Sequence, residues 1–348
     1  MQRVVCALWR YGYRRSSGFL VELWLIHLAG GAGIFFVTRW HIAARVLALA
    51  GYPSHHVVMK PLLRRVLPVL LQGLLVLSPG AGAAECVLTV MTYNLRYASD
   101  APPNAWPSRR PIMKACMESV QPDLIGTQEG LYRQLRELAA DLPEYDWIGT
   151  GRDGGSRGEF MAVFYRRARF EPLEYDHFWL SDTPEVIASS TWGNANRRMV
   201  TWVRFRDRES GFEFYFWNTH LDHAIQAARE KGATLIRDRV NALKTHLPVL
   251  LVGDFNAVAG ANPVYDVLVR EGGFKDTWQL AAERRNADFN TFNGFAPPKR
   301  EGRRIDWILL RGEADVAWSE IVTFAQNGQF PSDHFPVVAR VRLNTPAR

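Results

Sequence analysis

The chain has 348 residues, of which 47% are hydrophobic and 22% charged, so its composition is that of a globular protein with a sizeable core. Three cysteines exclude a disulfide-rich miniprotein. The net charge of +7 is confined to the N-terminus: nine of the 42 basic and two of the 35 acidic side chains lie in residues 1–85, which leaves 33 of each sign in residues 86–348. A formally neutral body removes bulk electrostatic attraction as a basis for tight, non-specific DNA binding.

Two apolar stretches precede this neutral body. Residues 18–37 are long enough to span a bilayer, although they carry Glu22 and His27. Residues 59–84 have the layout of a secretory signal peptide, with a basic start, an apolar run over 66–77 that is too short to span, and small-residue cleavage sites around Ala83.

We therefore expect residues 1–58 to be an upstream extension, residues 59–84 a signal peptide, and residues 85–348 an exported domain, either periplasmic or secreted. A membrane anchor through residues 18–37 is the alternative. Export would place Cys86 and Cys116 in an oxidising compartment, where a disulfide between them and two unpaired buried thiols are both open.

Strand-like and helix-like patterns alternate along residues 86–348 without a repeat or a long linker, which predicts one domain. The expected helices cover residues 108–120, with Ser108 as the N-cap, 131–142 and 223–247. A turn at 208–211 predicts a hairpin between the strands on either side of it. The mixed order predicts an α/β sandwich with mixed sheets. The expected strands cover residues 87–95, 123–127, 160–165, 199–206, 213–218, 249–252, 304–310 and 337–343.

Polar side chains gather where these apolar strands end. Such groups are costly to bury unless they are hydrogen-bonded or used, and loops at strand ends are where sites are usually built. We therefore expect them to converge at one edge of the packed sheets. Asp306, inside an apolar strand, has a structural ion pair with Arg304 as its alternative. The residues are Asn94, Glu129, Asn218, His220, Asp222, Asp254, Asn256, Asp306, Asp333 and His334.

This set of side chains suits one kind of chemistry. It is rich in carboxylate and amide oxygens and has no thiolate and no Gly-x-Ser-x-Gly nucleophile. Oxygen ligands without sulfur favour Mg²⁺ or Mn²⁺ over zinc. A hard cation, a carboxylate that activates water and histidines that face an anion together indicate hydrolysis of a phosphoester.

The same residues form an ordered series of short motifs that resembles the endonuclease/exonuclease/phosphatase superfamily, which has the deoxyribonuclease-I-like fold. The series is TYNL, TQE, NTHLDH, GDFN, RIDWI and SDHFPV, and it extends from residue 92 to residue 337. Each motif is weak alone, but six in the right order are specific. The resemblance implies a four-layer α/β (α+β) sandwich, in which two mixed β-sheets pack face to face with helices outside.

The resemblance also implies roles for individual residues, with Mg²⁺ or Mn²⁺ as the cofactor. Glu129 is the main metal ligand, Asn94 lies beside it on the metal or on a bound phosphate, and Asp333 is a second ligand or a supporting acid. Water attacks in line, without a covalent enzyme intermediate.

The remaining roles concern the phosphate and the attacking water. Asp254 orients or deprotonates the water. His220 and His334 face the phosphate, Asp306 orients His334, and Asn256 stabilises the non-bridging oxygens.

Substrate contacts are less well defined by the sequence. Arg197, Arg198 and Asn218 are candidates for contact with the phosphoester. The glycine-rich loop at residues 152–158 contacts a phosphate chain or is a plain surface loop. Trp179, Trp192 and Trp217 serve as stacking platforms or pack in the core.

Substrate identity stays open among nucleic acid, nucleotide, inositol or sugar phosphate and phospholipid head group. The neutral charge of the body favours a small phosphoester over long duplex DNA. No feature predicts an obligate protein partner, and we expect a monomer. A non-catalytic binding or toxin-subunit-like module on the same fold is the alternative function.

Overall fold

The computed structural model describes residues 9–14, 20–25 and 85–344, and the chain divides into two compact units, Met1–Ser78 and Pro79–Arg348. In the first unit, β1 (Trp9–Arg14) pairs antiparallel with β2 (Leu20–Leu25). Residues 20–25, part of the alternative membrane anchor, are thus a strand, and the expected signal peptide, residues 59–84, lies outside the described residues. No helix in the described parts is both long and apolar enough to cross a membrane.

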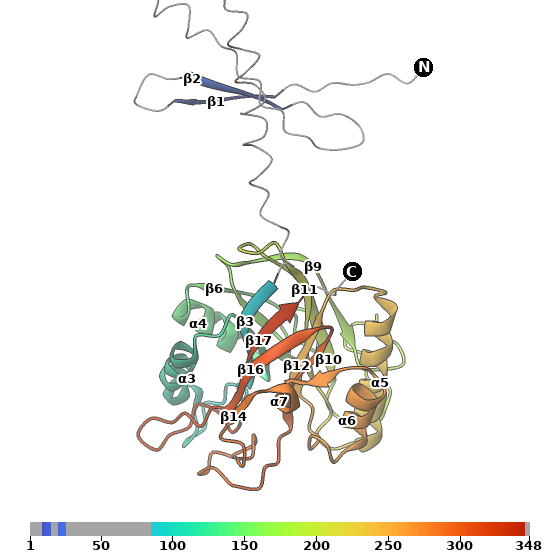
Figure 1. The fold of residues 1–348 in the computed structure, drawn as a ribbon. Coiled ribbons are helices and arrows are strands. Elements are labelled where there is room, and N and C mark those ends of the chain that lie inside the picture. Colours follow the sequence, from blue (N-terminus) through green and yellow to red (C-terminus); the bar gives the residue numbers. More distant parts are fainter. Residues whose placement is uncertain (1–8, 15–19, 26–84, 345–348) are drawn as a thin grey trace, which may run out of the picture. The chain divides into compact units, whose positions relative to one another are not determined.

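Two mixed β-sheets form the centre of the second unit (Figure 1). The six-stranded sheet has the order β13 (Lys275–Asp276), β15 (Asp306–Arg311), β12 (Val249–Asp254), β11 (Glu213–His220), β10 (Met199–Asp207), β9 (Phe170–Trp179). The seven-stranded sheet has the order β14 (Glu283–Arg285), β16 (Ala314–Ile321), β17 (Val337–Asn344), β3 (Glu85–Asn94), β4 (Leu124–Gln128), β8 (Val163–Arg166), β6 (Tyr145–Ile148).

Helices cover the outer faces of both sheets. In Figure 1, α3 (Trp106–Val120) and α4 (Tyr132–Asp141) lie on one side of the sheets. On the other side lie α5 (Gln226–Ala242) and α6 (Pro263–Tyr265), and α6 runs into the π-helical turn η1 (Asp266–Arg270). The short α7 (Thr277–Leu280) follows β13, and β5 (Gly130–Leu131) pairs with β7 (Glu159–Phe160) as a separate ribbon. The four-layer sandwich is confirmed.

Alternation along the strands creates three hydrophobic layers. On β11, Phe214 and Phe216 point into the core between the sheets, whereas Tyr215 and Trp217 pack under α5. On β3, Val90 points inward, and the outer side chains Met91 and Tyr93 pack against α3 and α4. This period of two is expected when both faces of a sheet are buried.

Most predicted elements are confirmed, with shifted ends. The hairpin of β10 and β11 forms as expected. The first expected helix starts at Trp106 instead of 108, because Pro107 favours the first turn, and its N-cap is Ala105 rather than Ser108. The helix expected over 223–247 is shorter, since Asp222 accepts hydrogen bonds from the backbone of residues 224 and 225 and so delays its start to Gln226.

Cys86 and Cys116 are free and buried on opposite faces of the seven-stranded sheet. Cys86 points into the core between the sheets, and Cys116 on α3 packs against the outer face. The sheet therefore separates the two sulfur atoms, so the structure contains the unpaired thiols and not the disulfide.

Candidate active site

The candidate site lies at the strand ends, where the side chains that point between the two sheets change from apolar to polar. On β11 and β12 the inner positions change from Phe216 and Val252 to His220 and Asp254 at the strand ends. His220 lies beside Asp254, and Asp254 lies beside Asp306 in the strand register, so the three form one row across the sheet. The strand pairing thus brings together residues that are far apart in sequence.

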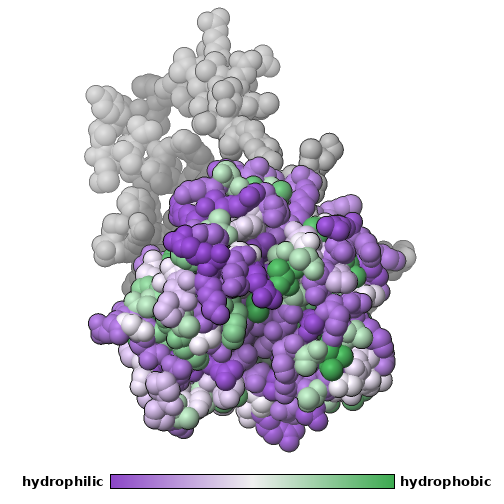
Figure 2. Space-filling model, turned by 90° about the horizontal axis from the view of Figure 1, so that it is seen from below, coloured by the Kyte–Doolittle hydropathy of each residue, from purple (hydrophilic) through white to green (hydrophobic). Residues whose placement is uncertain are grey.

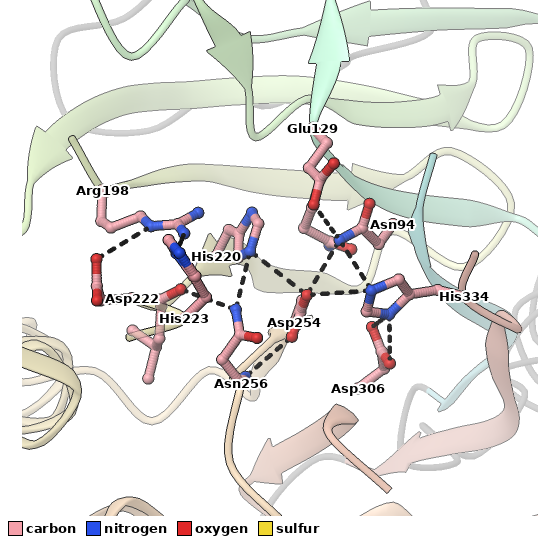
Figure 3. A network of polar contacts seen from close by, with 12 residues as sticks. Asn94, Glu129, Arg198, His220, Asp222, His223, Asp254, Asn256, Asp306 and His334 are labelled. Carbon is pink, nitrogen blue, oxygen red and sulfur yellow. Dashed lines mark hydrogen bonds and ion pairs between the residues drawn. The ribbon is translucent and has the colours of Figure 1, made fainter. Parts of the chain in front are cut away.

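Asp306, His334 and Asp254 form a buried chain of charges (Figure 3). His334 Nδ1 lies 3.0 Å from Asp306 Oδ2, and its Nε2 lies 3.7 Å from Asp254 Oδ2. Burial alone would lower the pKa of His334, but the two carboxylates raise it to about 10. Burial and then the charge of Asp306 raise the pKa of Asp254 to about 7. An imidazolium therefore lies beside a carboxyl group that titrates near neutral pH.

The alternative ion pair between Asp306 and Arg304 is not formed. Arg304 instead binds Asp276, with Nη2 2.5 Å from Oδ2. The carboxylate of Asp306 therefore pairs with His334.

Asn94 connects the two sheets beneath the cavity. It is fully buried, and its Nδ2 lies 3.0 Å from Glu129 Oε1 and 3.0 Å from Asp254 Oδ2. Its Oδ1 accepts a hydrogen bond from the backbone N–H of Arg96. Because both ends of the amide are used by protein groups, Asn94 holds Glu129 and Asp254 in place.

Glu129 and Asp333 present the carboxylates best placed for a cation. Their side chains are 14% and 10% exposed, and the guanidinium of Arg96 lies 3.9 Å from Glu129 and 3.6 Å from Asp333. Burial raises the pKa of Asp333 despite the charge of His334. The two acids thus form a place in which the protein already accommodates a positive charge.

His220 and Asn256 form the other side of the row. Asn256 Nδ2 lies 3.0 Å from His220 Nε2 and 3.1 Å from the carbonyl oxygen of Leu221. Burial and then the charge of Arg198 lower the pKa of His220 well below its usual value, so its ring is neutral. Among the described residues His220 Nδ1 has no hydrogen-bond partner, although it is buried. His220 Nε2 also lies 3.4 Å from Asp254 Oδ2, so this ring nitrogen faces both Asn256 and Asp254.

Backbone strain marks the same place. Arg96, Glu129 and Asn256 adopt left-handed conformations with φ of 52°, 62° and 48°. For a residue other than glycine such a conformation costs about 1–3 kcal/mol and persists only where the surroundings enforce it. Three residues of one cluster share this conformation, which six other non-glycine residues of the described structure also adopt.

The three substrate candidates have different positions. Arg198 borders the cavity, is 4% exposed and has an Nε and an Nη1 without hydrogen-bond partners within the described residues. Arg197 lies outside the cavity, where it binds Asp153 and the carbonyl oxygen of residue 188. Asn218 is fully buried between the sheets, and its amide bonds to Gln128, Thr127 and residue 162. Of the three candidates, only Arg198 lines the cavity.

A cavity of about 440 Å³ opens onto this cluster. Figure 2 views the end of the sandwich at which β3 finishes, and its surface is mainly hydrophilic with small apolar patches. Glu129, Asp254 and His334, which the sequence predicted to meet, all border the cavity. Its lining consists of Arg96, Tyr97, Glu129, Arg152, Glu159, Asn196, Arg198, His220, His223, Asp254, Asn256, Phe292, Ile305, Asp333 and His334.

Several lining residues were missed by the sequence analysis. Arg152 belongs to the glycine-rich loop that was left open, and Glu159 follows it directly. Tyr97 and Phe292 are exposed aromatic residues at the cavity; Tyr97 lies two residues after the TYNL motif, and Phe292 lies outside the recognised motifs. Trp179 and Trp217 are buried, which excludes them as stacking platforms, and Trp192 packs at the margin of the outer core.

The family assignment rests on the match of the sequence to the model of the endonuclease/exonuclease/phosphatase family over residues 91–334, well over half of the chain. The chain belongs to this family. Its members are phosphoester hydrolases.

Two solved structures from Bacteroides thetaiotaomicron resemble the chain over nearly their full length. A mannosyl-6-phosphatase is 36% identical, with 73% of this chain and 99% of that chain covered and a TM-score of 0.69. An endonuclease/exonuclease/phosphatase family protein is 34% identical, with 76% of this chain and 97% of that chain covered and a TM-score of 0.72.

A curated relative, the Nocturnin of Drosophila melanogaster, is 26% identical over 290 residues, which covers 69% of this chain and 42% of that protein. The chain spans between 42% and 59% of the length of the curated relatives that it matches.

Proposed function

We propose that the protein is a divalent-metal-dependent phosphoester hydrolase in which an activated water attacks the phosphorus in line. The observation that carries the proposal is the convergence of Glu129, Asp254 and His334 on one cavity. The family match and the mannosyl-6-phosphatase neighbour support the reaction class. A binding module would have no use for buried acids of raised pKa, so the cluster favours catalysis.

The donor set of the cluster fits Mg²⁺ or Mn²⁺. Glu129 and Asp333 offer carboxylate oxygens at the place where Arg96 already supplies a positive charge. We assign these two acids as ligands, with Asn94 holding Glu129. When bound, the ion supplies Lewis-acid polarisation of the phosphoryl group.

A second group of possible ligands is formed by Asp254, Asp306 and His334, whose ligand atoms lie within 4.8 Å of one another. The pKa of about 10 keeps His334 protonated at neutral pH, and an imidazolium has no lone pair for a metal ion. We therefore assign this group to proton transfer and charge stabilisation.

The side chains at the cavity have separate roles in the proposed reaction. Asp254, with a pKa near 7, accepts the proton of the attacking water. His334, held by Asp306, donates a hydrogen bond to a phosphoryl oxygen. A group of this kind, aimed at charge that develops in the transition state, contributes about 10²–10³-fold. His220 and Asn256 border the same cavity, and the amide of Asn256 bonds His220 Nε2 and the carbonyl oxygen of Leu221.

A substrate screen tests this proposal. The purified full chain is incubated with Mg²⁺, Mn²⁺ or EDTA and a panel of p-nitrophenyl phosphate, bis-p-nitrophenyl phosphate, hexose phosphates, inositol phosphates, single- and double-stranded DNA and RNA. We expect release of phosphate or cleaved product that requires the metal and stops with EDTA. No turnover of any substrate, or turnover unaffected by EDTA, would contradict the proposal.

We further propose that the domain is exported through the signal peptide at residues 59–84. Sequencing the N-terminus of the naturally produced protein tests this. A mature chain that begins at residue 84 or 85 is expected, and a mature chain that retains residues 18–37 would support the membrane anchor instead.

A further inference from the structure

The glycine-rich loop at residues 152–158 borders the cavity through its first residue, Arg152, and Glu159 directly after it also lines the cavity. The ribbon of β5 and β7 pairs Leu131 with Glu159, so the residue after this loop lies across from the strand that follows Glu129. The loop is closed by a hydrogen bond from the backbone N–H of Arg152 to the carbonyl oxygen of Glu159, and Trp179 Nε1 donates to the carbonyl oxygen of Arg152 at 2.8 Å. These contacts fix the loop beside the proposed metal ligand.

Three side chains form a polar array at the cavity. Arg152 Nη1 lies 2.6 Å from Glu159 Oε2, and Arg152 Nη2 donates to Asn196 Oδ1 at 3.2 Å. The ion pair is largely buried, with side-chain exposures of 14% for Arg152 and 15% for Glu159. All three residues border the cavity together with Arg198.

Stability alone does not account for this array. A buried ion pair contributes little net stability, because the desolvation of both charges offsets their attraction. Burial raises the pKa of Glu159 to about 6 even though Arg152 lowers it. Within residues 85–344, the hydrogen bonds of these side chains use Glu159 Oε2 and Asn196 Oδ1, both on the guanidinium of Arg152, which leaves Glu159 Oε1 as an acceptor and Asn196 Nδ2 as a donor.

The arrangement of donors and acceptors selects the class of ligand. Each alcohol hydroxyl both donates and accepts a hydrogen bond, so neighbouring hydroxyls match alternating carboxylate, guanidinium and amide groups. The charge of Glu159 is paired with that of Arg152, so the pair as a whole is neutral and does not call for a charged leaving group. Tyr97 and Phe292, 37% and 49% exposed, offer apolar surface to carbon-bound hydrogens.

We propose that Arg152, Glu159 and Asn196 form a leaving-group subsite that recognises the hydroxyls of a neutral polyhydroxy alcohol, such as a monosaccharide, esterified by a single phosphate. This proposal rests on the proposed function, since it assigns the leaving group of the same reaction. Hydrolysis releases that alcohol, whose oxygen keeps the electron pair of the broken P–O bond and takes up a proton, and water supplies the new oxygen on phosphorus.

The test compares two leaving groups in one enzyme. The kcat/KM values for mannose 6-phosphate and glucose 6-phosphate are measured against that for p-nitrophenyl phosphate, whose leaving group has no neighbouring hydroxyls. Glu159→Gln keeps the shape of the side chain, and Asn196→Ala removes the amide. Each variant should lower kcat/KM for the better hexose phosphate about 10- to 100-fold, the loss expected for a hydrogen bond to a charged or buried group, and leave p-nitrophenyl phosphate within threefold.

Glu213→Gln serves as the matched control. Glu213 also binds an arginine, Arg206, at 2.8 Å, but it lies at the start of β11, away from the cavity. This variant should change neither substrate. Unfolding temperatures of all variants show whether each protein is folded.

The outcomes separate the two proposals. If the wild-type protein hydrolyses no phosphoester, the proposed function fails. If it hydrolyses p-nitrophenyl phosphate but neither hexose phosphate, or if folded Glu159→Gln and Asn196→Ala lower all substrates equally or none, the subsite proposal is overturned while the proposed function stands.

Discussion

The two ends of β3 lie in opposite electrostatic environments. At its start, Asp123 and Asp207 bind Arg169 at 3.0 and 3.1 Å, and Arg340 lies 3.5 Å from Asp123. At its end, Asn94 enters the cluster in which Asp254 has no arginine partner within the described residues. Asp207 and Asp254 are both 1% exposed, so burial alone does not explain the difference.

The pKa directions express this contrast. Although burial opposes the charge of Asp207, the hydrogen bonds from Arg169 and Ser210 lower its pKa. Burial likewise opposes the charge of Arg169, but Asp207 raises its pKa. At the cavity, burial and Asp306 raise the pKa of Asp254, and burial and Arg152 lower that of Arg198. At the start of β3 the surroundings stabilise the charged forms of Asp207 and Arg169. At the cavity they destabilise the charged forms of Asp254 and Arg198, which are therefore available to interact with a ligand.

An Asp→Asn substitution should therefore have opposite effects on stability at the two ends, and it should lower activity only at Asp254. Asp254→Asn removes the proposed base and should lower kcat about 10²–10⁴-fold on p-nitrophenyl phosphate. Its unfolding free energy at pH 8 should rise by about 0.5–2 kcal/mol, because a destabilised functional charge is removed. Steady-state kinetics and urea unfolding check the two parts, and a variant that is both active and less stable would break the comparison.

Asp207→Asn should act in the reverse sense. It weakens a buried ion pair while Arg169 retains Asp123, so we expect a loss of about 1–3 kcal/mol in unfolding free energy. At a temperature where circular dichroism shows the variant to be folded, kcat should stay within threefold of wild type. A large loss of kcat in the folded variant would show that this end also serves catalysis.

The pH dependence of stability sharpens the comparison in metal-free protein. Asp254 has a raised folded pKa, so its contribution is present below its unfolded pKa of about 3.9 and is lost as the pH rises through about 7. Asp207 has a lowered folded pKa, so its contribution is present above about pH 3.9 and is lost as the pH falls. Melting temperatures from pH 3 to pH 8 should show the Asp254→Asn variant gaining on wild type toward pH 8, and the Asp207→Asn variant approaching wild type toward pH 3.

A smaller effect is expected at Asp306. Asp306→Asn leaves His334 in place but removes the charge that raises its pKa, so the alkaline limit of kcat should move to lower pH. A pH–rate profile measures this shift. An unchanged alkaline limit would mean that His334 is not the group that titrates there.

Much of the site was predictable because its residues interrupt apolar strands. His220, Asp254 and Asp306 occupy inner positions that continue the alternation of the core, and the motif order identifies them. Asn218 occupies such a position as well, but it binds only protein groups, because it lies one inner position deeper on β11 than His220. Sequence spacing does not show how far the cavity reaches.

The missed elements depend on contacts that are not local. β9 carries Pro172 and a charged, exposed middle, so no apolar alternation marks it, and pairing with β10 makes it a strand. β16 has a bulge between Val316 and Trp318 that breaks its alternation. Glu159 was missed because its partner Arg152 is seven residues away and only the loop closure joins them.

The most direct test of the account is metal-dependent turnover of p-nitrophenyl phosphate by wild type, Asp254→Asn and Asp207→Asn measured side by side. The account predicts turnover with Mg²⁺ or Mn²⁺ in the wild type and in Asp207→Asn, loss of that turnover in EDTA, and a rate at least 10²-fold lower in Asp254→Asn. Equal turnover by the two folded variants would contradict it.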